Sequence, residues 1–221
     1  MNANKICFLS CVNNEELYQQ CLLAIHSLAV PAGYEVETLA IKSAVSMTAG
    51  YNEAMGRTDA KYKVYLHQDL LIINKHLLQD VLDLFSDPQI GMIGVAGSRQ
   101  IPSSGVWWEA GSLYGKVYDS HSGMMSLLAF QEVEEEYQEV QGIDGLIMIT
   151  QFDLPWRDDI FTGWHFYDLS QCREFNHSGY KVVVPRQKQP WCIHNCGVVS
   201  VRDYHYYRQV FLNEYGQELF S

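Results

Sequence analysis

Two short segments of the chain carry side chains that are able to bind a metal ion. Residues 67–69 read His-Gln-Asp and follow an apolar run of strand length, and residues 192–196 read Cys-Ile-His-Asn-Cys. A carboxylate is a good ligand for hard divalent cations, and an imidazole suits Mn²⁺-like ions better than Mg²⁺. The second segment clusters only three soft ligands, whereas a structural zinc site takes four. The sequence therefore disfavours a zinc knot at 192–196 and leaves Asp69 as either a cation ligand or a solvated turn residue.

Polar residues that follow predicted strands are the other candidates for a site. Asn13 follows the apolar run 5–12, and the segment 42–44, which contains Ser43, follows a second run at 35–41. In open α/β sheets, ligands bind beyond the carboxyl ends of the strands. We therefore expect these residues to share one edge of a sheet with residues 67–69.

The spacing of apolar residues predicts an alternation of strands and helices. Strands are predicted at 5–12, 35–41, 60–66, 90–96, 143–150 and 180–184. Helices are predicted from an Asn13 cap to a point before Pro31, around 51–55, from an Asn74 cap to 85, at 166–178 and at 203–219. Residues 100–139 are predicted to form edge strands and loops. Right-handed crossovers would place the main strands in one mostly parallel sheet, so the expected fold class is α/β.

Composition narrows the class of protein. A length of 221 residues favours one domain, and the formal net charge of -11 with only 15 Lys and Arg residues disfavours nucleic acid as a partner. No apolar run approaches the roughly 18–20 residues of a transmembrane helix. The six cysteines follow no secretion signal, so we expect reduced thiols in a soluble, cytoplasmic protein.

The order of the polar motifs resembles that of the family 2 glycosyltransferases over most of residues 5–196. The resemblance rests on Asn13, Asn52, Asp69 and the segment 163–168, which reads Gly-Trp-His-Phe-Tyr-Asp and is followed by Gly-Tyr at 179–180. The stretches 46–55, 65–69 and 143–145 are similar to a smaller group, the glycosyltransferase-like domain named for a streptomycin-biosynthesis protein. The resemblance implies a single GT-A domain, with a Rossmann-like nucleotide-binding half at about 1–98, an acceptor half at about 99–200 and a C-terminal helix at 201–221.

The resemblance also implies a divalent metal beside the leaving diphosphate. The family holds this ion with an Asp-any-Asp motif, and the matching residues 67–69 keep only the last carboxylate. Asp69 is then expected to bind the metal and the donor, with His194 and His67 as further ligands. The imidazoles favour Mn²⁺ over Mg²⁺. His67 has a second interpretation as a hydrogen-bonded structural residue.

An inverting transfer needs a base that takes the proton of the acceptor hydroxyl, and Asp168 matches the family's position for this base. The family usually has Glu before this Asp, and here Tyr167 replaces it. Asp168 has an alternative role as a helix cap. The resemblance places Trp164, by stacking on a sugar, and Asp144 at the acceptor pocket, whereas Trp107 and Trp108 are more typical of a core.

On the donor side, Asn13, Ser43 and Asn52 are the expected contacts, and the family's Asp after the second strand is missing. Asn52 has an alternative role in capping a turn. The expected function is an inverting, metal-dependent transfer from a nucleotide-diphosphate sugar to a small-molecule or glycan acceptor. Two alternatives are a non-catalytic sugar- or nucleotide-binding protein and a nucleotidyltransferase. The second usually has a Gly-rich, basic loop after the first strand, unlike the Cys-Val-Asn-Asn sequence at 11–14.

Overall fold

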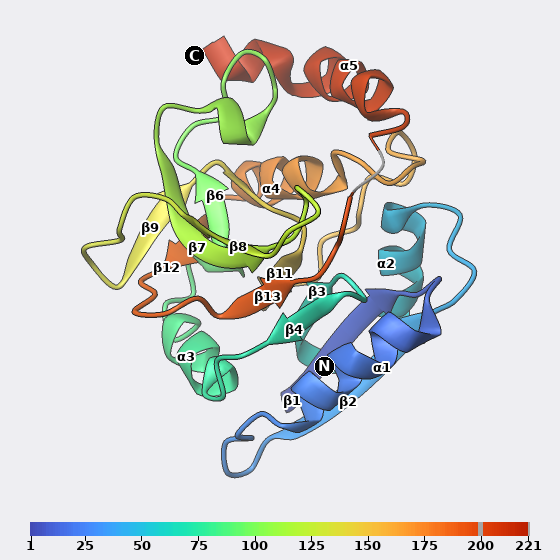
Figure 1. Ribbon diagram of the computed structural model, residues 1–221, viewed down its shortest axis with the longest axis vertical. Helices are drawn as coiled ribbons and strands as arrows, with labels where there is room; N and C mark the ends of the chain where they lie inside the picture. Colours follow the sequence, from blue (N-terminus) through green and yellow to red (C-terminus); the bar gives the residue numbers. More distant parts are fainter. Residues whose placement is uncertain (199–200, 221) are drawn as a thin grey trace.

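The N-terminal part of the chain alternates strands and helices, as its apolar periodicity predicts. The computed structural model describes residues 1–198 and 201–220 (Figure 1). The first elements are β1 (Asn2–Cys11), α1 (Glu15–His26), β2 (Glu35–Ile41), α2 (Met47–Gly56) and β3 (Ala60–Leu66). β1 pairs in parallel with both β2 and β3, so the carboxyl ends of these strands meet at one edge.

The cap of α1 is Asn14, one residue later than predicted. Its side chain accepts hydrogen bonds from the backbone N–H groups of Glu16 and Leu17. Asn13 is not the cap because its side chain is paired with Gln68, which donates to the Asn13 oxygen at 2.6 Å. This contact ties the end of β1 to the turn after β3.

The strands form two sheets instead of the single sheet that was predicted. The larger sheet has the order β2-β1-β3-β11-β5-β12-β9 and the other has the order β10-β6-β7-β13-β4, with β8 paired to β7. β11 runs antiparallel to β3 and β5, so the larger sheet is mixed. The remaining strands are β4 (Leu70–Ile72), β5 (Ile90–Ile93), β6 (Ala96–Ser98), β7 (Leu113–Asp119), β8 (Ser126–Ala129), β9 (Tyr137–Val140), β10 (Gly142–Ile143), β11 (Ile147–Thr150), β12 (Lys181–Pro185) and β13 (Cys192–His194).

Two of the predicted strands are each divided between the sheets. The run 90–96 becomes β5 and β6, and the run 143–150 becomes β10 and β11. Gly94 lies at the first crossing, where a Cβ atom would come within 2.6 Å of the Ile143 side chain. The second crossing, at residues 144–146, carries Asp144. Its backbone N–H donates to the carbonyl oxygen of Ala96 at 2.9 Å.

The helices cover both faces of the larger sheet. α1 and α3 (Leu77–Leu84) contribute to one buried apolar cluster, and α2 and α4 (Tyr167–His177) contribute to a second. Asn74 does not cap α3 because its side chain accepts from the N–H of His76, the residue that precedes the helix. A third cluster joins α4 to α5 (Tyr204–Tyr215), which lies at the opposite end of the molecule from α1 in Figure 1.

Two short 3-10 helices complete the described elements. They span Trp107–Glu109 and Gly216–Phe220, the second continuing from α5. None of the helices in residues 1–198 and 201–220 combines the length and apolar character that crossing a membrane requires.

Candidate active site

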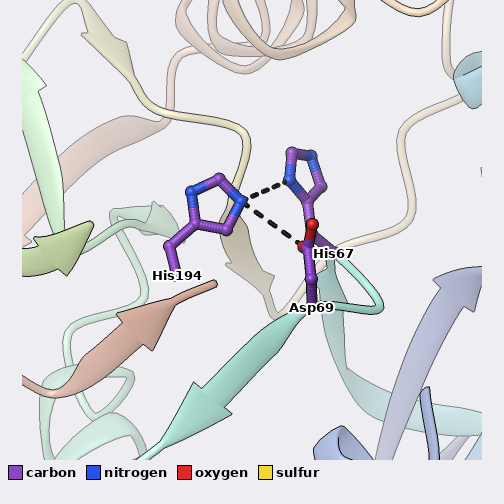
Figure 2. A group of neighbouring side chains, drawn as sticks. All are labelled: His67, Asp69 and His194. Carbon is purple, nitrogen blue, oxygen red and sulfur yellow. Dashed lines mark hydrogen bonds and ion pairs between the residues drawn. The ribbon is translucent and has the colours of Figure 1, made fainter. Parts of the chain in front are cut away.

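Asp69 and His194 lie side by side, although they are far apart in the sequence. Asp69 is in the turn between β3 and β4, and His194 is the last residue of β13, which pairs antiparallel with β4. His194 Nε2 lies 3.4 Å from Asp69 Oδ1 (Figure 2). The backbone N–H of Asn195 also donates to the Asp69 carbonyl oxygen at 2.9 Å. The expected proximity of the two side chains is confirmed.

His67 is held through both of its ring nitrogens. Nδ1 faces His194 Nε2 (Figure 2), at a distance of 3.2 Å, and Nε2 lies 2.6 Å from the hydroxyl of Tyr167. The Tyr167 hydroxyl in turn donates to the Gly145 carbonyl oxygen. One proton arrangement satisfies this chain of contacts: His67 carries its proton on Nε2, donates to Tyr167, and accepts at Nδ1 from His194.

Asp119, at the end of β7, holds the other nitrogen of His194. β7 pairs in parallel with β13, and Asp119 Oδ2 lies 2.8 Å from His194 Nδ1. The second oxygen of Asp119 accepts from the backbone N–H and the ring Nδ1 of His121. Sequence reasoning missed Asp119 because it lies in the region predicted as edge strands and loops. Its only local signal is that of a polar residue at the end of a strand.

His194 is 8% exposed, so it does not line an open cleft as predicted. β13 lies between β4 and β7, and the ring is enclosed by Asp119, Asp69 and His67. Burial acts to lower the pKa of His194, but its hydrogen bond to Asp119 and its ion pair with Asp69 outweigh burial and raise it. Burial, together with repulsion from His194, lowers the pKa of His67. The charge of the pair therefore resides on His194, which is consistent with the proton arrangement above.

The residues around Asp69 fit a divalent cation. Within the described part of the chain, Asp69 Oδ1 is buried and has no hydrogen-bond partner, although it faces His194. The ligand atoms offered by His67, Asp69 and His194 all lie within 4.8 Å of one another. One carboxylate and two imidazoles form a donor set suited to Mn²⁺-like ions. Because both nitrogens of His67 are engaged, His67 becomes a ligand only if its contact with His194 opens.

Asp168 lies in the first turn of α4, directly after Tyr167. It does not occupy the cap position, which belongs to Phe166 at a left-handed φ of 62°. The Asp168 carboxylate accepts from the backbone N–H groups of Leu169 and Gly145, at 2.9 and 3.2 Å. Burial, and next the nearby carboxylate of Asp144, raise the pKa of Asp168 to about 7. Burial also raises the pKa of Asp144, whose side chain accepts from the N–H of Leu146.

The three residues expected on the donor side have different surroundings. Asn13 is exposed and paired with Gln68, and Ser43 is exposed after β2. Asn52 lies inside α2. Its side-chain oxygen accepts a hydrogen bond from the N–H of Trp156 at 2.8 Å, and its side-chain nitrogen donates to the Trp156 carbonyl oxygen at 2.9 Å. The Asn52 side chain thus fastens α2 to the segment before α4 and does not cap a turn.

Three tryptophans that the sequence singled out differ in their exposure. Trp164 is 46% exposed just before α4, whereas Trp107 is buried. Trp108 is half exposed, so its predicted position in the core is wrong.

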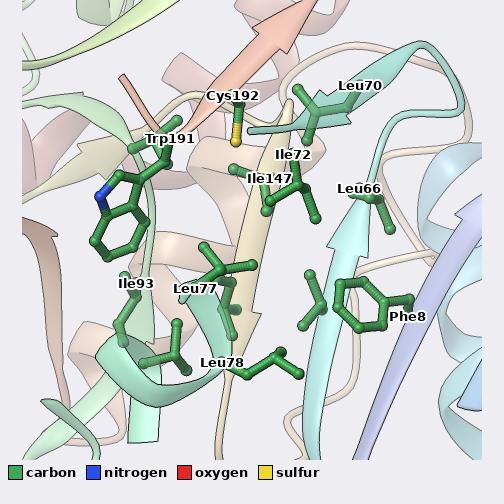
Figure 3. Packing of buried hydrophobic residues seen from close by; sticks show 14 of the residues in the cluster. Phe8, Leu66, Leu70, Ile72, Leu77, Leu78, Ile93, Ile147, Trp191 and Cys192 are labelled. Atoms are coloured by element: carbon green, nitrogen blue, oxygen red, sulfur yellow. The ribbon is translucent and has the colours of Figure 1, made fainter. Parts of the chain in front are cut away.

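Cys192 is fully buried within the apolar cluster that contains Ile72 and Leu77 (Figure 3). The described metal-ligating clusters pair His194 with other residues than Cys192.

Comparisons with known proteins agree with this architecture. The sequence matches the glycosyltransferase-like family over residues 7–215. The fold is similar to that of S. aureus TarS 1–349 in complex with UDP, with a TM-score of 0.59, 10% identity and coverage of 95% of this chain and 65% of that one. It is also similar to mannosyltransferase PcManGT from Pyrobaculum calidifontis in complex with GDP-Man and Mn²⁺, with a TM-score of 0.57, 12% identity and coverage of 95% and 61%.

The chain therefore spans less than two thirds of the length of either solved chain. No curated protein matches the sequence. The two structural neighbours are GT-A glycosyltransferases, which identifies the mixed α/β architecture as a GT-A fold. On the family match over residues 7–215, the chain belongs to the glycosyltransferase-like family.

Proposed function

We propose that this protein is an inverting glycosyltransferase that uses a nucleotide-diphosphate sugar and a divalent cation. The observation that carries the proposal is the contact of Asp69 with His194 at 3.4 Å, beside the His67–Tyr167 pair that leads to Asp168. The proposed cation ligands and the candidate base are thus joined through one chain of contacts, which runs from Tyr167 through Gly145 to Asp168. Family membership and the GT-A neighbours support the same reaction class.

Asp69 and His194 are the proposed cation ligands, His194 through Nε2 after that nitrogen has lost its proton, and His67 is a third ligand when its contact with His194 opens. The bound ion would supply charge stabilisation to the diphosphate as it leaves. Imidazole ligands favour Mn²⁺ over Mg²⁺, and one structural neighbour was solved with Mn²⁺. The remaining coordination positions are left to donor oxygens and water.

Asp168 is the proposed general base. Its carboxylate takes the proton of the acceptor hydroxyl, and the acceptor oxygen forms a bond to the anomeric carbon. The bond from that carbon to the diphosphate oxygen breaks, and the diphosphate leaves with the electron pair. A pKa of about 7 suits this role, because the carboxylate is then both available and basic near neutral pH. We assign the acceptor, a small molecule or glycan, to the side of Trp164 and Asp144.

The donor contacts and the finer classification are part of the proposal. Asn13 and Ser43 follow β1 and β2 at the edge where nucleotides bind in such sheets. The neighbours were solved with UDP, UDP-GlcNAc and GDP-Man, which supports a nucleotide-diphosphate sugar as donor. We assign the chain to the group named for the streptomycin-biosynthesis protein on the motifs at 46–55, 65–69 and 143–145. The nucleotide-binding half then covers about 1–98 and the acceptor half about 99–200.

A thermal-shift screen followed by a hydrolysis assay tests this function. We expect UDP or GDP to raise the melting temperature only together with Mn²⁺, because a specific ligand stabilises the folded state by mass action. The matching nucleotide sugar is then expected to release its diphosphate slowly in the absence of acceptor. Stabilisation of equal size without any divalent ion would contradict the metal dependence.

One observation favours a second candidate, a non-catalytic nucleotide-sugar-binding protein. His67 stands where the family has Asp, and both of its nitrogens are engaged within the protein. Metal-dependent binding of donor without any release of diphosphate, across a panel of donors and acceptors, would identify this second function.

A further inference from the structure

A second set of side chains that are able to bind a metal ion lies on the other side of His194 from Asp69. Asp119 Oδ2 is 2.8 Å from His194 Nδ1, and the sulfur of Cys196 lies 3.8 and 3.9 Å from the two oxygens of Asp119. The ligand atoms of these three residues all lie within 4.8 Å of one another. This set brings together one carboxylate, one imidazole and one thiol.

Backbone contacts hold the two segments that carry these residues. The Ser120 N–H donates to the His194 carbonyl oxygen at 3.2 Å, and the Ser120 hydroxyl accepts from the N–H of Gly197 at 2.9 Å. Gly197 has a left-handed φ of 59°, which lets the chain turn directly after Cys196. Asp119, His194 and Cys196 are therefore placed together by the fold and do not depend on a ligand to bring them together.

Two of the three distances between the ligand atoms are close to those of a tetrahedral zinc site. Bonds of about 2.3 Å to sulfur and about 2.0 Å to nitrogen or oxygen separate sulfur from oxygen by about 3.5 Å and nitrogen from oxygen by about 3.3 Å. The corresponding distances here are 3.8 and 2.8 Å. Each differs from the tetrahedral value by about half an ångström or less, which side-chain rotations are able to absorb.

We infer that Asp119, His194 Nδ1 and Cys196 form a binding site for a soft divalent cation, of which Zn²⁺ is the best match. Thiolate and imidazole select Zn²⁺ over the harder ions that suit the Asp69 side. The fourth position belongs to water or to His121, whose Nδ1 lies 2.6 Å from Asp119 Oδ1 and whose side chain is 53% exposed. The site differs from a knot of Cys192, His194 and Cys196, because Cys192 faces the apolar cluster.

The proposed Zn²⁺ site and the proposed active site share His194, each through a different ring nitrogen. Zn²⁺ on Nδ1 would replace the hydrogen bond to Asp119, whereas the proposed catalytic cation approaches Nε2 from Asp69. Binding of Zn²⁺ also requires that His194 Nδ1 and the Cys196 thiol lose their protons, so uptake of the ion should release protons.

Titration with Zn²⁺ and Co²⁺, in the absence of any nucleotide, tests the site. Co²⁺ reports a thiolate ligand through a sulfur-to-metal charge-transfer band. We expect the band in the wild-type protein and in Cys11→Ser, and its loss in Cys196→Ser. Cys11 is the matched control because it is the other cysteine that is not fully buried. Cys196→Ser and Asp119→Asn should each weaken Zn²⁺ binding by at least the roughly 10–100-fold that loss of an outer-sphere partner costs.

Asp69→Ala separates this site from the proposed active site. The variant should keep its Zn²⁺ affinity and its Co²⁺ band, whether or not the chain transfers sugars. A wild-type Co²⁺ spectrum without the charge-transfer band would overturn the inference, as would equal Zn²⁺ affinities of Cys196→Ser and Cys11→Ser. Loss of Zn²⁺ binding in Asp69→Ala would place the ion at Asp69 and would equally overturn it.

Discussion

The hydroxyl of Tyr167 lies 2.6 Å from Nε2 of His67 and joins the turn after β3 to the first turn of α4. Tyr167 stands where the resembled family has Glu, and His67 stands where that family has Asp. The two residues that differ from the family pattern therefore contact each other directly. One uncharged hydrogen bond links the positions that two acidic residues would occupy.

Removing the Tyr167 hydroxyl tests this link. Tyr167→Phe leaves a partly buried ring nitrogen of His67 without its partner, so we expect the free energy of unfolding to fall by about 1–3 kcal/mol. Mn²⁺-dependent nucleotide binding should weaken, because the Tyr167 hydroxyl then no longer holds the His67 ring in its place beside the proposed cation ligands. Chemical denaturation and calorimetric titration measure the two effects. Tyr206→Phe, at an exposed position of α5, is the control and should change neither.

The pH dependence of the reaction tests the role of Asp168. Since the pKa of this carboxyl is about 7 and only the deprotonated form accepts a proton, kcat/KM should rise with pH and level off above that value. Asp168→Asn should lower turnover by about 100-fold or more and leave donor binding nearly unchanged. A variant that turns over at the wild-type rate would show that Asp168 serves the structure of α4 alone.

Stability should respond to the same group in the opposite direction. Burial raises the pKa of Asp168 from 3.8 to about 7, so between these values the folded protein holds a proton that the unfolded chain has released. The contribution of this group to the free energy of unfolding therefore decreases as pH rises through this range. Asp168→Asn removes the buried charge, and its melting temperature relative to wild type should increase from about pH 5 to about pH 8. A difference that is the same at both pH values would be evidence against the raised pKa.

Asp119 is expected to position His194 for the cation at Asp69. Asp119→Asn replaces the carboxylate that fixes Nδ1 of His194, and loss of such an outer-sphere partner lowers metal affinity by about 10–100-fold. Mn²⁺ titration followed by electron paramagnetic resonance, with UDP present, measures this change. His121→Ala is the matched control, because it removes a neighbour of the other Asp119 oxygen and keeps the bond to His194. Equal Mn²⁺ affinities of the two variants would contradict the positioning role.

The sequence predicted the elements that local patterns determine, and it failed where the structure depends on contacts between distant residues. The strands at 35–41 and 60–66 have the predicted bounds, because their apolar runs end at clear polar boundaries. The predictions of one continuous strand at 90–96 and another at 143–150 were wrong, because an apolar pattern shows that a segment is buried but not which sheet it joins.

The site shows the same division between local and distant information. The pairing of Asp69 with His194 followed from a resemblance to a known family, whereas Asp119 and the Tyr167 contact did not. Asp119 meets His194 only because β7 lies beside β13, and that pairing joins distant parts of the chain. No local motif marks such a contact, so a single sequence does not predict it.

Asn52 illustrates a residue whose predicted role competes with a structural one. Its amide bonds both backbone groups of Trp156, and loss of both bonds in Asn52→Ala should lower the free energy of unfolding by about 1–3 kcal/mol. Donor affinity of the folded variant then decides between the roles. Ser43→Ala, at an exposed position after β2, should leave stability unchanged and provides the comparison for donor binding. A fully stable Asn52→Ala variant with weakened donor binding would show that Asn52 binds the donor and is not required for stability.

Calorimetric titration of UDP and GDP into the wild-type protein and Asp69→Ala, with and without Mn²⁺, tests the central claim most directly. Asp69 Oδ1 is the buried carboxylate oxygen that faces His194 and has no hydrogen-bond partner in the described structure. We predict that Mn²⁺ strengthens nucleotide binding in the wild-type protein and that this gain is absent in Asp69→Ala. Nucleotide binding that Mn²⁺ strengthens equally in both proteins would contradict a cation site at Asp69.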